Sequence, residues 1–282
     1  MARQSPRFGD VPLHRIEASK SLFDLHLDEL WLHRELLYFL TWRDLKLRYK
    51  QTVLGALWAV VQPLMMMVVF TFVFGGFAKV PSDGLPYPIF AYVALVPWNF
   101  FSSALGRCVG SLVGNSGIIS KVYFPRLLIP LSSTFAGFLD FGIAFTILVA
   151  MMAWYGFTPG WAVVTVPLFL LLALMTALAV GLWLTALNVK FRDVSHGISF
   201  VLQLWMYASP VAYPVSVVPE QWRFLYILNP MVTVIQGFRW ALLGAEMPDF
   251  GVSAVSIAGV LAVLYGGMVY FKRTERTMVD VI

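Results

Sequence analysis

The chain has 282 residues, of which 59% are hydrophobic and 12% are charged, and its formal net charge is +5. Soluble domains carry about 25% charged residues, so this composition excludes an ordinary soluble protein and predicts apolar helices with lipid as their solvent. Cytoplasmic loops of a membrane protein account for the positive charge, so no nucleic-acid partner is implied.

The N-terminal region differs from the rest of the chain. Residues 1–52 are polar and contain nine of the 20 Lys and Arg residues. They show no short apolar core with a small-residue cleavage site, so we expect no cleaved signal peptide and assign residues 1–30 to a cytoplasmic segment. The four His residues have no metal-ligand spacing, and no metal site is predicted. With Cys108 as the one cysteine, no intrachain disulfide is possible.

Residues 31–52 are predicted to form an amphipathic helix in the membrane interface. With a step of about 100° per residue, one stripe of this helix is mainly aromatic and contains Trp31, Tyr38, Trp42, Leu45 and Tyr49. A second stripe contains Leu36, Leu40 and Leu47 and adjoins the basic residues Arg43, Lys46 and Lys50. Rings at the level of the lipid headgroups are typical of such helices. The helix is either an anchor alone or a mobile gate at the cytoplasmic mouth, and periodicity does not separate the two.

Residues 53–282 are predicted to form an all-α transmembrane domain with six spans. A spanning helix needs about 20 mostly apolar residues. The segments that meet this length are residues 53–77, 88–106, 127–155, 161–187, 197–217 and 250–271. The second is the weakest because it contains Pro88, Pro97 and Asn99, although membrane helices tolerate proline where neighbours satisfy the freed backbone groups.

The Lys and Arg residues are concentrated on one side of this six-span arrangement. Residues 1–52, 107–126, 188–196 and 272–282 hold 17 of the 20, and the opposite side holds Lys79, Arg223 and Arg239. Because cytoplasmic loops carry an excess of positive residues, both termini are predicted to be cytoplasmic.

Asp140 lies near the middle of the third predicted span, 13 residues from one end and 15 from the other. A carboxylate at that depth is costly and is a functional candidate by default. The simpler interpretation is a protonated or hydrogen-bonded Asp that faces Ser or Thr on a neighbouring helix. One Asp without partner carboxylates or histidines makes a poor proton relay.

Two short apolar stretches precede the last span. "PEQWRFLYIL" (219–228) and "MVTVIQGFRWALLG" (231–244) both have helical patterns, and they meet at Asn229-Pro230, a natural helix break. Both are too short to span, so we expect an external hairpin of re-entrant helices. Its rings form either an aromatic belt or an aromatic-lined exit for sugars: Trp222, Phe224, Tyr226, Phe238 and Trp240.

The sequence carries no recognisable catalytic machinery. It lacks a G-x-x-x-x-G-K-[ST] phosphate loop and has no Gly-Lys dipeptide. We find no nucleophile–base or paired-carboxylate arrangement, and no convincing inverted pair of broken helices of the kind found in many secondary transporters. We therefore predict a transport protein, not an enzyme, whose energy comes from another subunit.

Several motifs resemble those of ABC-type polysaccharide export permeases, the transmembrane subunits that export O-antigen, teichoic acid and related lipid-linked glycans. The matching stretches are "WRDLKLRYKQTVLGALWAVVQPL" (42–64), "ISKVYFPRLLIPLSS" (119–133), "LNVKFRDV" (187–194), "SPVAYP" (209–214) and "LNP" (228–230) with Arg239. The resemblance covers residues 35–282 in order and leaves out residues 1–30.

The resemblance implies a homodimer in the bacterial plasma (inner) membrane, with a channel for a lipid-linked polysaccharide at the dimer interface. Two copies of a separate ATPase subunit would bind ATP and Mg, and this chain would hold no cofactor. The six spans, the interface helix and the two short external helices of the family agree with the elements predicted above.

The resemblance also implies roles for particular residues. A coupling loop at residues 114–126 would contact the ATPase through Lys121, Phe124, Pro125 and Arg126. A second cytoplasmic motif contains Asn188, Arg192 and Asp193, of which the last two can also form a local ion pair. The cytoplasmic gate in the interface helix would contain Tyr38, Trp42, Arg43 and Tyr49. The external gate, with glycan contacts, would contain Trp222, Tyr226, Phe238, Arg239 and Trp240.

Three alternatives stay open at the level of sequence. The first is an ABC exporter of another lipid or a drug. The second is an ion-coupled secondary transporter that uses Asp140. The third is a membrane enzyme such as a glycosyltransferase, which would need acidic catalytic residues outside the membrane.

Overall fold

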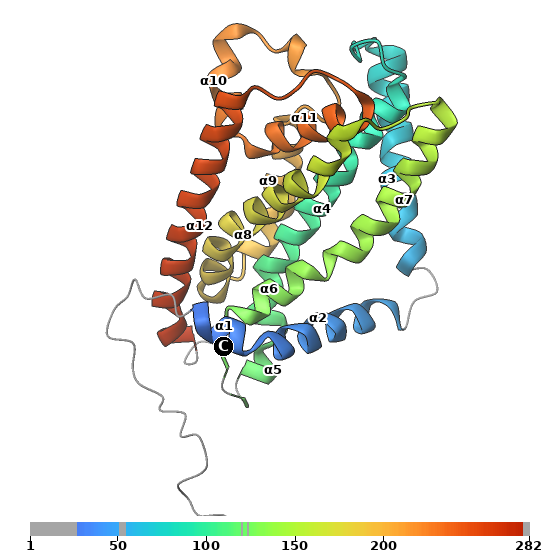
Figure 1. Cartoon of the computed structure of the whole chain (residues 1–282). Helices are drawn as coiled ribbons and strands as arrows, with labels where there is room; N and C mark the ends of the chain where they lie inside the picture. Colours follow the sequence, from blue (N-terminus) through green and yellow to red (C-terminus); the bar gives the residue numbers. More distant parts are fainter. Residues whose placement is uncertain (1–26, 51–54, 120, 123, 279–282) are drawn as a thin grey trace, which may run out of the picture.

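A computed structural model describes residues 27–50, 55–119, 121, 122 and 124–278, and all regular structure in these residues is helical. Figure 1 shows long helices that run between two ends of the molecule. The first, called here the α2 end, holds α1 (Leu27–Leu32), α2 (Arg34–Tyr49) and α5 (Ser116–Ile119). The second, called here the α11 end, holds α10 (Arg223–Leu228) and α11 (Pro230–Leu243). The all-α prediction is confirmed.

Five helical stretches of the described residues are long and apolar enough to cross a membrane. They are Leu57–Phe77, Tyr87–Gly114, Leu128–Tyr155, Trp161–Lys190 and Phe250–Glu275. The helices that build them are α3 (Gly55–Phe70) with the π-helical η1 (Thr71–Phe77), α4 (Tyr87–Gly114), α6 (Leu128–Phe135) with α7 (Gly137–Tyr155), the 3-10 helix η2 (Trp161–Thr165) with α8 (Val166–Lys190), and α12 (Phe250–Met278). They correspond to five of the six predicted spans.

The fifth predicted span, residues 197–217, is helical over a shorter length than expected. Helix α9 (Val194–Tyr207) has 14 residues and is followed by turns and the 3-10 helix η3 (Val215–Val217). At 1.5 Å per residue α9 is about 21 Å long, less than the hydrocarbon core of about 30 Å. The count of six spans therefore stays a prediction, in which α9 and the irregular segment after it would cross together.

The third predicted span is two helices and not one. α6 ends at Phe135 and α7 begins at Gly137, with Ala136 between them. At this break the Arg107 Nε donates a hydrogen bond to the Ser133 carbonyl at 3.0 Å. A helix break inside an apolar stretch needs such a donor, because lipid cannot satisfy the backbone groups that the break frees.

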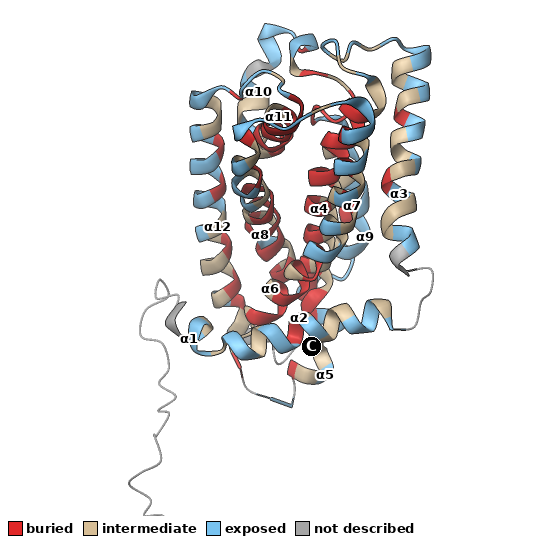
Figure 2. Ribbon diagram, turned by 45° about the vertical axis from the view of Figure 1, so that its right-hand side comes forward, coloured by how far each residue is buried: buried red, intermediate tan, exposed pale blue. Residues whose placement is uncertain are grey.

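Helices α4 and α8 form the centre of the molecule. Figure 2 shows buried residues concentrated along α4, α8 and α11, whereas α3 and α12 are largely exposed. The two central helices approach closely at Gly181, where an added Cβ would lie 2.6 Å from the Sγ of Cys108. The Thr185 hydroxyl donates to the Cys108 carbonyl at 2.8 Å and links the same pair. The bundle is therefore built around one close helix–helix crossing.

Helix α2 lies across the α2 end of the bundle and packs against α6 (Figure 1). Its Leu40 is buried in a cluster with Leu112, Phe124 and Leu128, and Leu36 packs against that cluster. Three members of the predicted aromatic stripe, Trp31, Tyr38 and Trp42, have exposed side chains, whereas Leu45 and Tyr49 are half-buried. The predicted helix 31–52 thus appears as α1 and α2, and residues 51 and 52 lie outside the described part of the chain.

Helix α11 is packed into the bundle at the opposite end. It follows the 3-10 helix η4 (Glu220–Trp222) and α10. It begins at Pro230, where the Asn229 side chain accepts a hydrogen bond from the Met231 backbone N–H. An added Cβ at Gly237 would lie 2.4 Å from the Phe169 ring, so α11 packs closely on α8. The two short helices predicted before the last span are present, and their re-entry into the bilayer stays a prediction.

Candidate functional site

A polar groove lies among the membrane-spanning helices. It has a volume of about 420 Å³ and is lined by residues of α2, α3, α4, α7 and α9. Uncharged polar side chains line much of it: Gln62, Asn99, Ser102, Ser103, Ser199 and Gln203. The rest of the lining is aliphatic, aromatic or charged, and its rings include Trp98, Phe100 and Tyr207. Polar groups at membrane depth are expensive unless they face a cavity or a partner, so this groove is the leading candidate for a path across the bundle.

Asn99 shows most directly that the groove suits polar contents. Its Nδ2 is buried and has no hydrogen-bond partner among the residues that the structure describes. The backbone carbonyl of Asn99 accepts hydrogen bonds from the Ser102 hydroxyl at 3.3 Å and from the Ser103 hydroxyl at 2.6 Å. A buried amide without a partner costs free energy, so Asn99 is a polar group that the packing of the described residues leaves unsatisfied.

Asp140 lies at the edge of this groove, but its partners differ from those predicted. Its Oδ2 is 2.5 Å from the Arg48 Nη1 and 3.6 Å from the Arg107 Nη1. The Tyr49 hydroxyl donates a hydrogen bond to its Oδ1. The carboxylate is hydrogen-bonded near the middle of its span, as expected, but the predicted Ser or Thr partner is wrong because α2 brings Arg48 and Tyr49 to the first turn of α7. The carboxylate thus contacts side chains of α2 and α4 from its place in α7.

Tyr49 belongs to the predicted gate and sits within this cluster. Burial and, to a smaller degree, the hydrogen bond to Asp140 raise the pKa of Tyr49 to about 12. The phenol therefore keeps its proton at neutral pH and acts as a donor toward the carboxylate. Sequence reasoning placed Tyr49 on the aromatic stripe and did not predict this contact.

The other predicted gate residues are divided between the two sides of α2. Arg43 pairs with Asp44 at 2.7 Å and donates to the Asn115 Oδ1 at 2.5 Å, which ties α2 to the end of α4. Tyr38 and Trp42 are exposed and face away from the bundle. Arg43 and Tyr49 are therefore positioned by protein contacts, whereas Tyr38 and Trp42 are free to contact lipid.

The predicted coupling loop contains both exposed and buried residues. Lys121 is exposed, whereas the Phe124 side chain is 6% exposed and belongs to the cluster around Leu40. Arg126 donates to the Glu275 carbonyl through Nη1 and lies 4.0 Å from the Glu275 carboxylate, and Pro125 beside it is half-buried. Phe124 and Arg126 thus connect the loop to its own chain, and Lys121 is the predicted contact residue that is available to a partner.

The second predicted motif contributes one buried structural residue. The Asn188 amide donates to the Val109 carbonyl at 3.1 Å and accepts from the Ser195 backbone N–H at 3.1 Å, joining α8, α4 and α9. Arg192 and Asp193 are both exposed, and within the described residues no ion pair joins them. The alternative of a local ion pair is therefore not realised.

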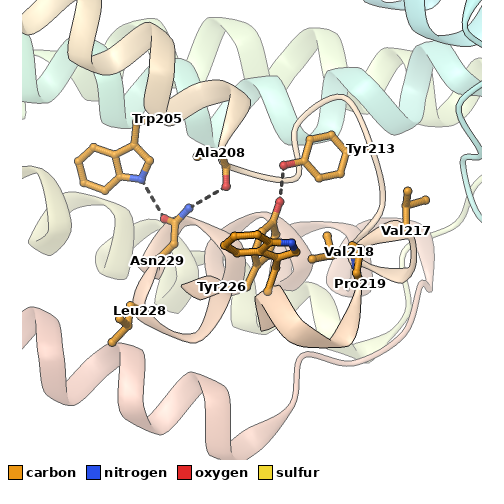
Figure 3. Close-up of a pocket in the computed structure, with 10 residues that line it drawn as sticks. Trp205, Ala208, Tyr213, Val217, Val218, Pro219, Tyr226, Leu228 and Asn229 are labelled. Carbon is orange, nitrogen blue, oxygen red and sulfur yellow. Dashed lines mark hydrogen bonds between the residues drawn. The ribbon is translucent and has the colours of Figure 1, made fainter. Parts of the chain in front are cut away.

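An aromatic pocket of about 640 Å³ lies at the α11 end (Figure 3). Its lining includes the predicted residues Trp222 and Tyr226, together with Trp205, Tyr213 and Asn229. The Trp205 Nε1 donates to the Asn229 Oδ1 at 2.9 Å, and the hydroxyls of Tyr213 and Tyr226 are hydrogen-bonded to each other. Burial raises the pKa of both tyrosines, so they remain neutral hydrogen-bonding groups.

The remaining predicted residues of the external gate are not exposed to this pocket. Phe238 is fully buried. Arg239 is also buried, with its guanidinium 3.6 Å from the Phe90 ring centroid and its Nη2 donating to the Val211 carbonyl at 3.1 Å. Trp240 packs edge-on against Trp161. Arg239 therefore fixes α11 against α4 and the segment after α9, and burial keeps it away from any ligand in the pocket.

The comparison with known sequences matches this architecture to one family. The sequence model of the ABC-2 type transporter family matches residues 35–243 of the chain. The chain is a member of the ABC-2 type transporter family. The predicted resemblance to ABC-type export permeases is thereby confirmed, and the five long apolar helices make the chain a multi-pass membrane protein.

Curated relatives align over most of the ABC-2 chain. It is 32% identical over 236 residues to the O-antigen export system permease protein RfbA of Myxococcus xanthus, covering 81% of this chain and 90% of that protein. It is 29% identical to the protein of the same name from Klebsiella pneumoniae, covering 86% of this chain and 93% of that one. It is 24% identical to the polysialic acid transport protein KpsM of Escherichia coli, over 84% of this chain and 92% of that protein.

Proposed function

We propose that the chain is the channel-forming permease subunit of an ATP-driven exporter that moves a lipid-linked polysaccharide across the bacterial inner membrane. The observation that carries this proposal is the alignment, over most of both chains, with permeases named for O-antigen export and polysialic acid transport. The polar groove supports it, since a soluble cargo has no route through hydrocarbon about 30 Å thick.

The chemistry of the groove suits a long polar chain that has to slide. Gln62, Ser103 and Gln203 offer uncharged hydrogen-bonding groups, and Trp98 and Tyr207 offer rings. Many weak contacts of this kind hold a sugar chain without trapping it, whereas one tight site would stall transport. A second copy of the chain would close the groove into a channel, in agreement with the homodimer expected from the family.

The energy for transport would come from a separate ATPase that binds ATP and Mg, present in two copies. The described residues contain no group of His, Cys, Asp and Glu that could hold a metal ion. Lys121, exposed at the α2 end, is the proposed contact with the ATPase. The α2 end would then face the cytoplasm with both termini, and the α11 end would face outward.

The aromatic pocket at the α11 end is the proposed exit contact for the glycan. Trp222 is 51% exposed and Tyr226 is half-buried beside it. Rings stack on the apolar faces of sugars, and the neighbouring Asn229 amide is held by Trp205, Met231 and Ser209 and so fixes the wall of the pocket. The proposed glycan contacts are accordingly Trp222 and Tyr226, and Trp205 and Tyr213 are added to them from the structure.

The contacts of Asp140 disfavour the ion-coupled alternative. Both oxygens of Asp140 are already engaged, Oδ2 by the guanidinium groups of Arg48 and Arg107 and Oδ1 by the Tyr49 hydroxyl. The pairing instead joins α2 to the membrane helices.

The deciding experiment is to purify the tagged chain from its native host in mild detergent and to identify what accompanies it by mass spectrometry. We expect a stoichiometric ATPase subunit that carries a phosphate loop. In parallel, deletion of the gene should remove a surface polysaccharide, and a plasmid copy should restore it. A protein that purifies alone in several detergents, from a host whose surface glycans survive the deletion, would contradict the proposal.

A further inference from the structure

The Asp140 cluster joins helices that differ in how far the bundle encloses them. Asp140 is in α7, Arg107 is in α4 at the centre of the bundle, and Arg48 and Tyr49 form the last turn of α2. Helix α3, which follows α2, has the least buried apolar stretch of the five spans. Figure 2 shows α3 at the side of the bundle with exposed and half-buried residues. The end of α2 and α3 thus have few buried residues, whereas α4 is the most buried of the five spans.

Arg107 is held mainly by helices other than α2, although Ser133, whose carbonyl it binds, also donates a hydrogen bond to Asp44 of α2. Its Nε donates to the Ser133 carbonyl at 3.0 Å, and its Nη2 lies 3.4 Å from the Ser103 hydroxyl. The guanidinium occupies the space over Gly137, where an added Cβ would lie 2.1 Å from its Nη2. Both contacts and the space belong to α4, α6 and α7, so they keep Arg107 beside Asp140 when the last turn of α2 moves away.

The Asp140 carboxylate therefore has two cationic partners. Arg107 stays close to it, and Arg48 can move away with the end of α2. Removing one partner of a buried ion pair is costly when it leaves a charge without compensation. Here the departure of Arg48 and Tyr49 would leave Asp140 next to Arg107, now 3.6 Å away. The second cation therefore lowers the cost of separating α2 from α7 and makes the contact reversible.

We propose that Asp140 is a positioning residue that latches the end of α2 against the polar groove, and that Arg107 receives the carboxylate when the latch opens. Arg48 and Asp140 both line the groove, so opening the latch widens the groove at the α2 end. The purpose assigned to this motion, admission of the cargo, rests on the proposed function. The latch itself rests on the contacts alone.

The test measures the docking of α2 directly. A nitroxide spin label is attached at Leu47→Cys, a position whose side chain is 70% exposed, in the full chain purified in lipid nanodiscs without cargo. The native Cys108 is buried and does not compete for the label. We expect Asp140→Asn and Arg48→Gln each to raise the ratio of mobile to immobile label by roughly tenfold, as expected when contacting residues are uncoupled.

The decisive variant is Arg107→Gln. It leaves the contact between Arg48 and Asp140 intact, so the label should stay immobile, while ATP-driven export by the assembled transporter slows because opening would leave Asp140 without a cation. Arg34→Gln, on the exposed part of α2, is the matched control and should change neither quantity.

Two results would overturn the latch. One is a label that stays immobile in both Asp140→Asn and Arg48→Gln, which would mean that other contacts dock α2. The other is an Arg107→Gln label as mobile as that of Asp140→Asn, which would make the cluster a single structural unit. Should Asp140→Asn fail to fold, Arg48→Gln still decides the first point. Since the label is read without cargo, failure of the export proposal would leave this outcome unaffected.

Discussion

Gly137 is required by the side chain that lies over it. An added Cβ would lie 2.1 Å from the Arg107 Nη2, and that guanidinium is held by the Ser133 carbonyl and Asp140. We expect Gly137→Ala to displace Arg107 and to destabilise the protein by about 1–3 kcal/mol, as overpacking commonly does. The measurement is the thermal unfolding midpoint of the purified protein in detergent.

Gly142 provides the control for this prediction. It lies in the same helix, and an added Cβ there would meet no atom within 4 Å. Gly142→Ala should leave the midpoint unchanged or raise it slightly, because Ala favours the helix by up to about 1 kcal/mol. Equal midpoints for the two variants would show that Arg107 can move without cost.

Arg239 and Trp222 were both predicted to contact the glycan, and the structure separates their roles. Arg239→Ala removes the donor to the Val211 carbonyl and the cation over the Phe90 ring. A buried acceptor left unsatisfied costs about 1–3 kcal/mol, so we expect a lower thermal midpoint. Trp222→Ala, at an exposed side chain, should preserve the midpoint and reduce export of the surface glycan. A normal midpoint in Arg239→Ala would count against its structural role.

The sequence identifies unusual residues better than it identifies their partners. Asp140 is conspicuous as an acid among apolar residues, but Arg48 and Arg107 lie 92 and 33 positions away along the chain. Only the packing of α2 and α4 against α7 brings the three together. In the same way, the burial of Phe124 and Arg239 depends on neighbours that no local pattern specifies, so exposed and buried members of one motif look alike.

At the scale of the elements, the predicted coupling loop divides into an exposed contact and a buried anchor. Lys121→Ala should uncouple ATP hydrolysis from export with no change in the unfolding midpoint, since the side chain is exposed. Phe124→Ala should lower the midpoint by an amount equivalent to about 3–5 kcal/mol, because it empties a place in the cluster around Leu40. Thermal unfolding, ATPase stimulation and export are measured on both variants. Full coupling in Lys121→Ala would exclude this residue as the contact.

The lengths of the apolar segments predict most of the helices. Proline explains the main difference between the predicted spans and the observed helices. The apolar run of the fifth predicted span continues to residue 217, but α9 ends at Tyr207. Pro210 and Pro214 lack backbone N–H groups, and each disfavours helical geometry in the residue before it. In α4, by contrast, Pro88 lies in the first turn, where its missing N–H costs nothing, and Pro97 lies inside a helix that continues to Gly114. Proline position, and not its presence, separates the two cases.

At the scale of the whole molecule, the path of the chain predicts which positions share a side of the membrane. Single cysteines at Lys46, Lys190 and Arg273 fall at the α2 end, and one at Glu246 falls near the α11 end. In intact cells, we expect a membrane-impermeant thiol reagent to label position 246 only. After permeabilisation, all four should react. Labelling of 190 and 246 from the same side would show that α9 does not carry the chain across, and the six-span count would fail.

The distribution of charge and apolar residues predicts the class of fold and the ends of most spans. It does so because lipid imposes length and composition on each helix separately. The same distribution does not predict which helices pack against one another, because Leu and Phe are equally suitable in contact with lipid and in contact with protein. Thus α3 and α8 are both strongly apolar, although only α8 lies at the centre.

The central position of α4 has a consequence for the synthesis of the protein. It is the least apolar of the five long helices and the most enclosed by others. Ribosomes deliver it to the membrane before α8 and α11, which cover it, have been made. During that interval the faces of α4 that α8 and α11 later cover are open to lipid or to the insertion machinery. The half-made chain therefore depends on a protein-lined shelter, such as the translocon or a membrane chaperone, until residue 243 has emerged and α11 can dock.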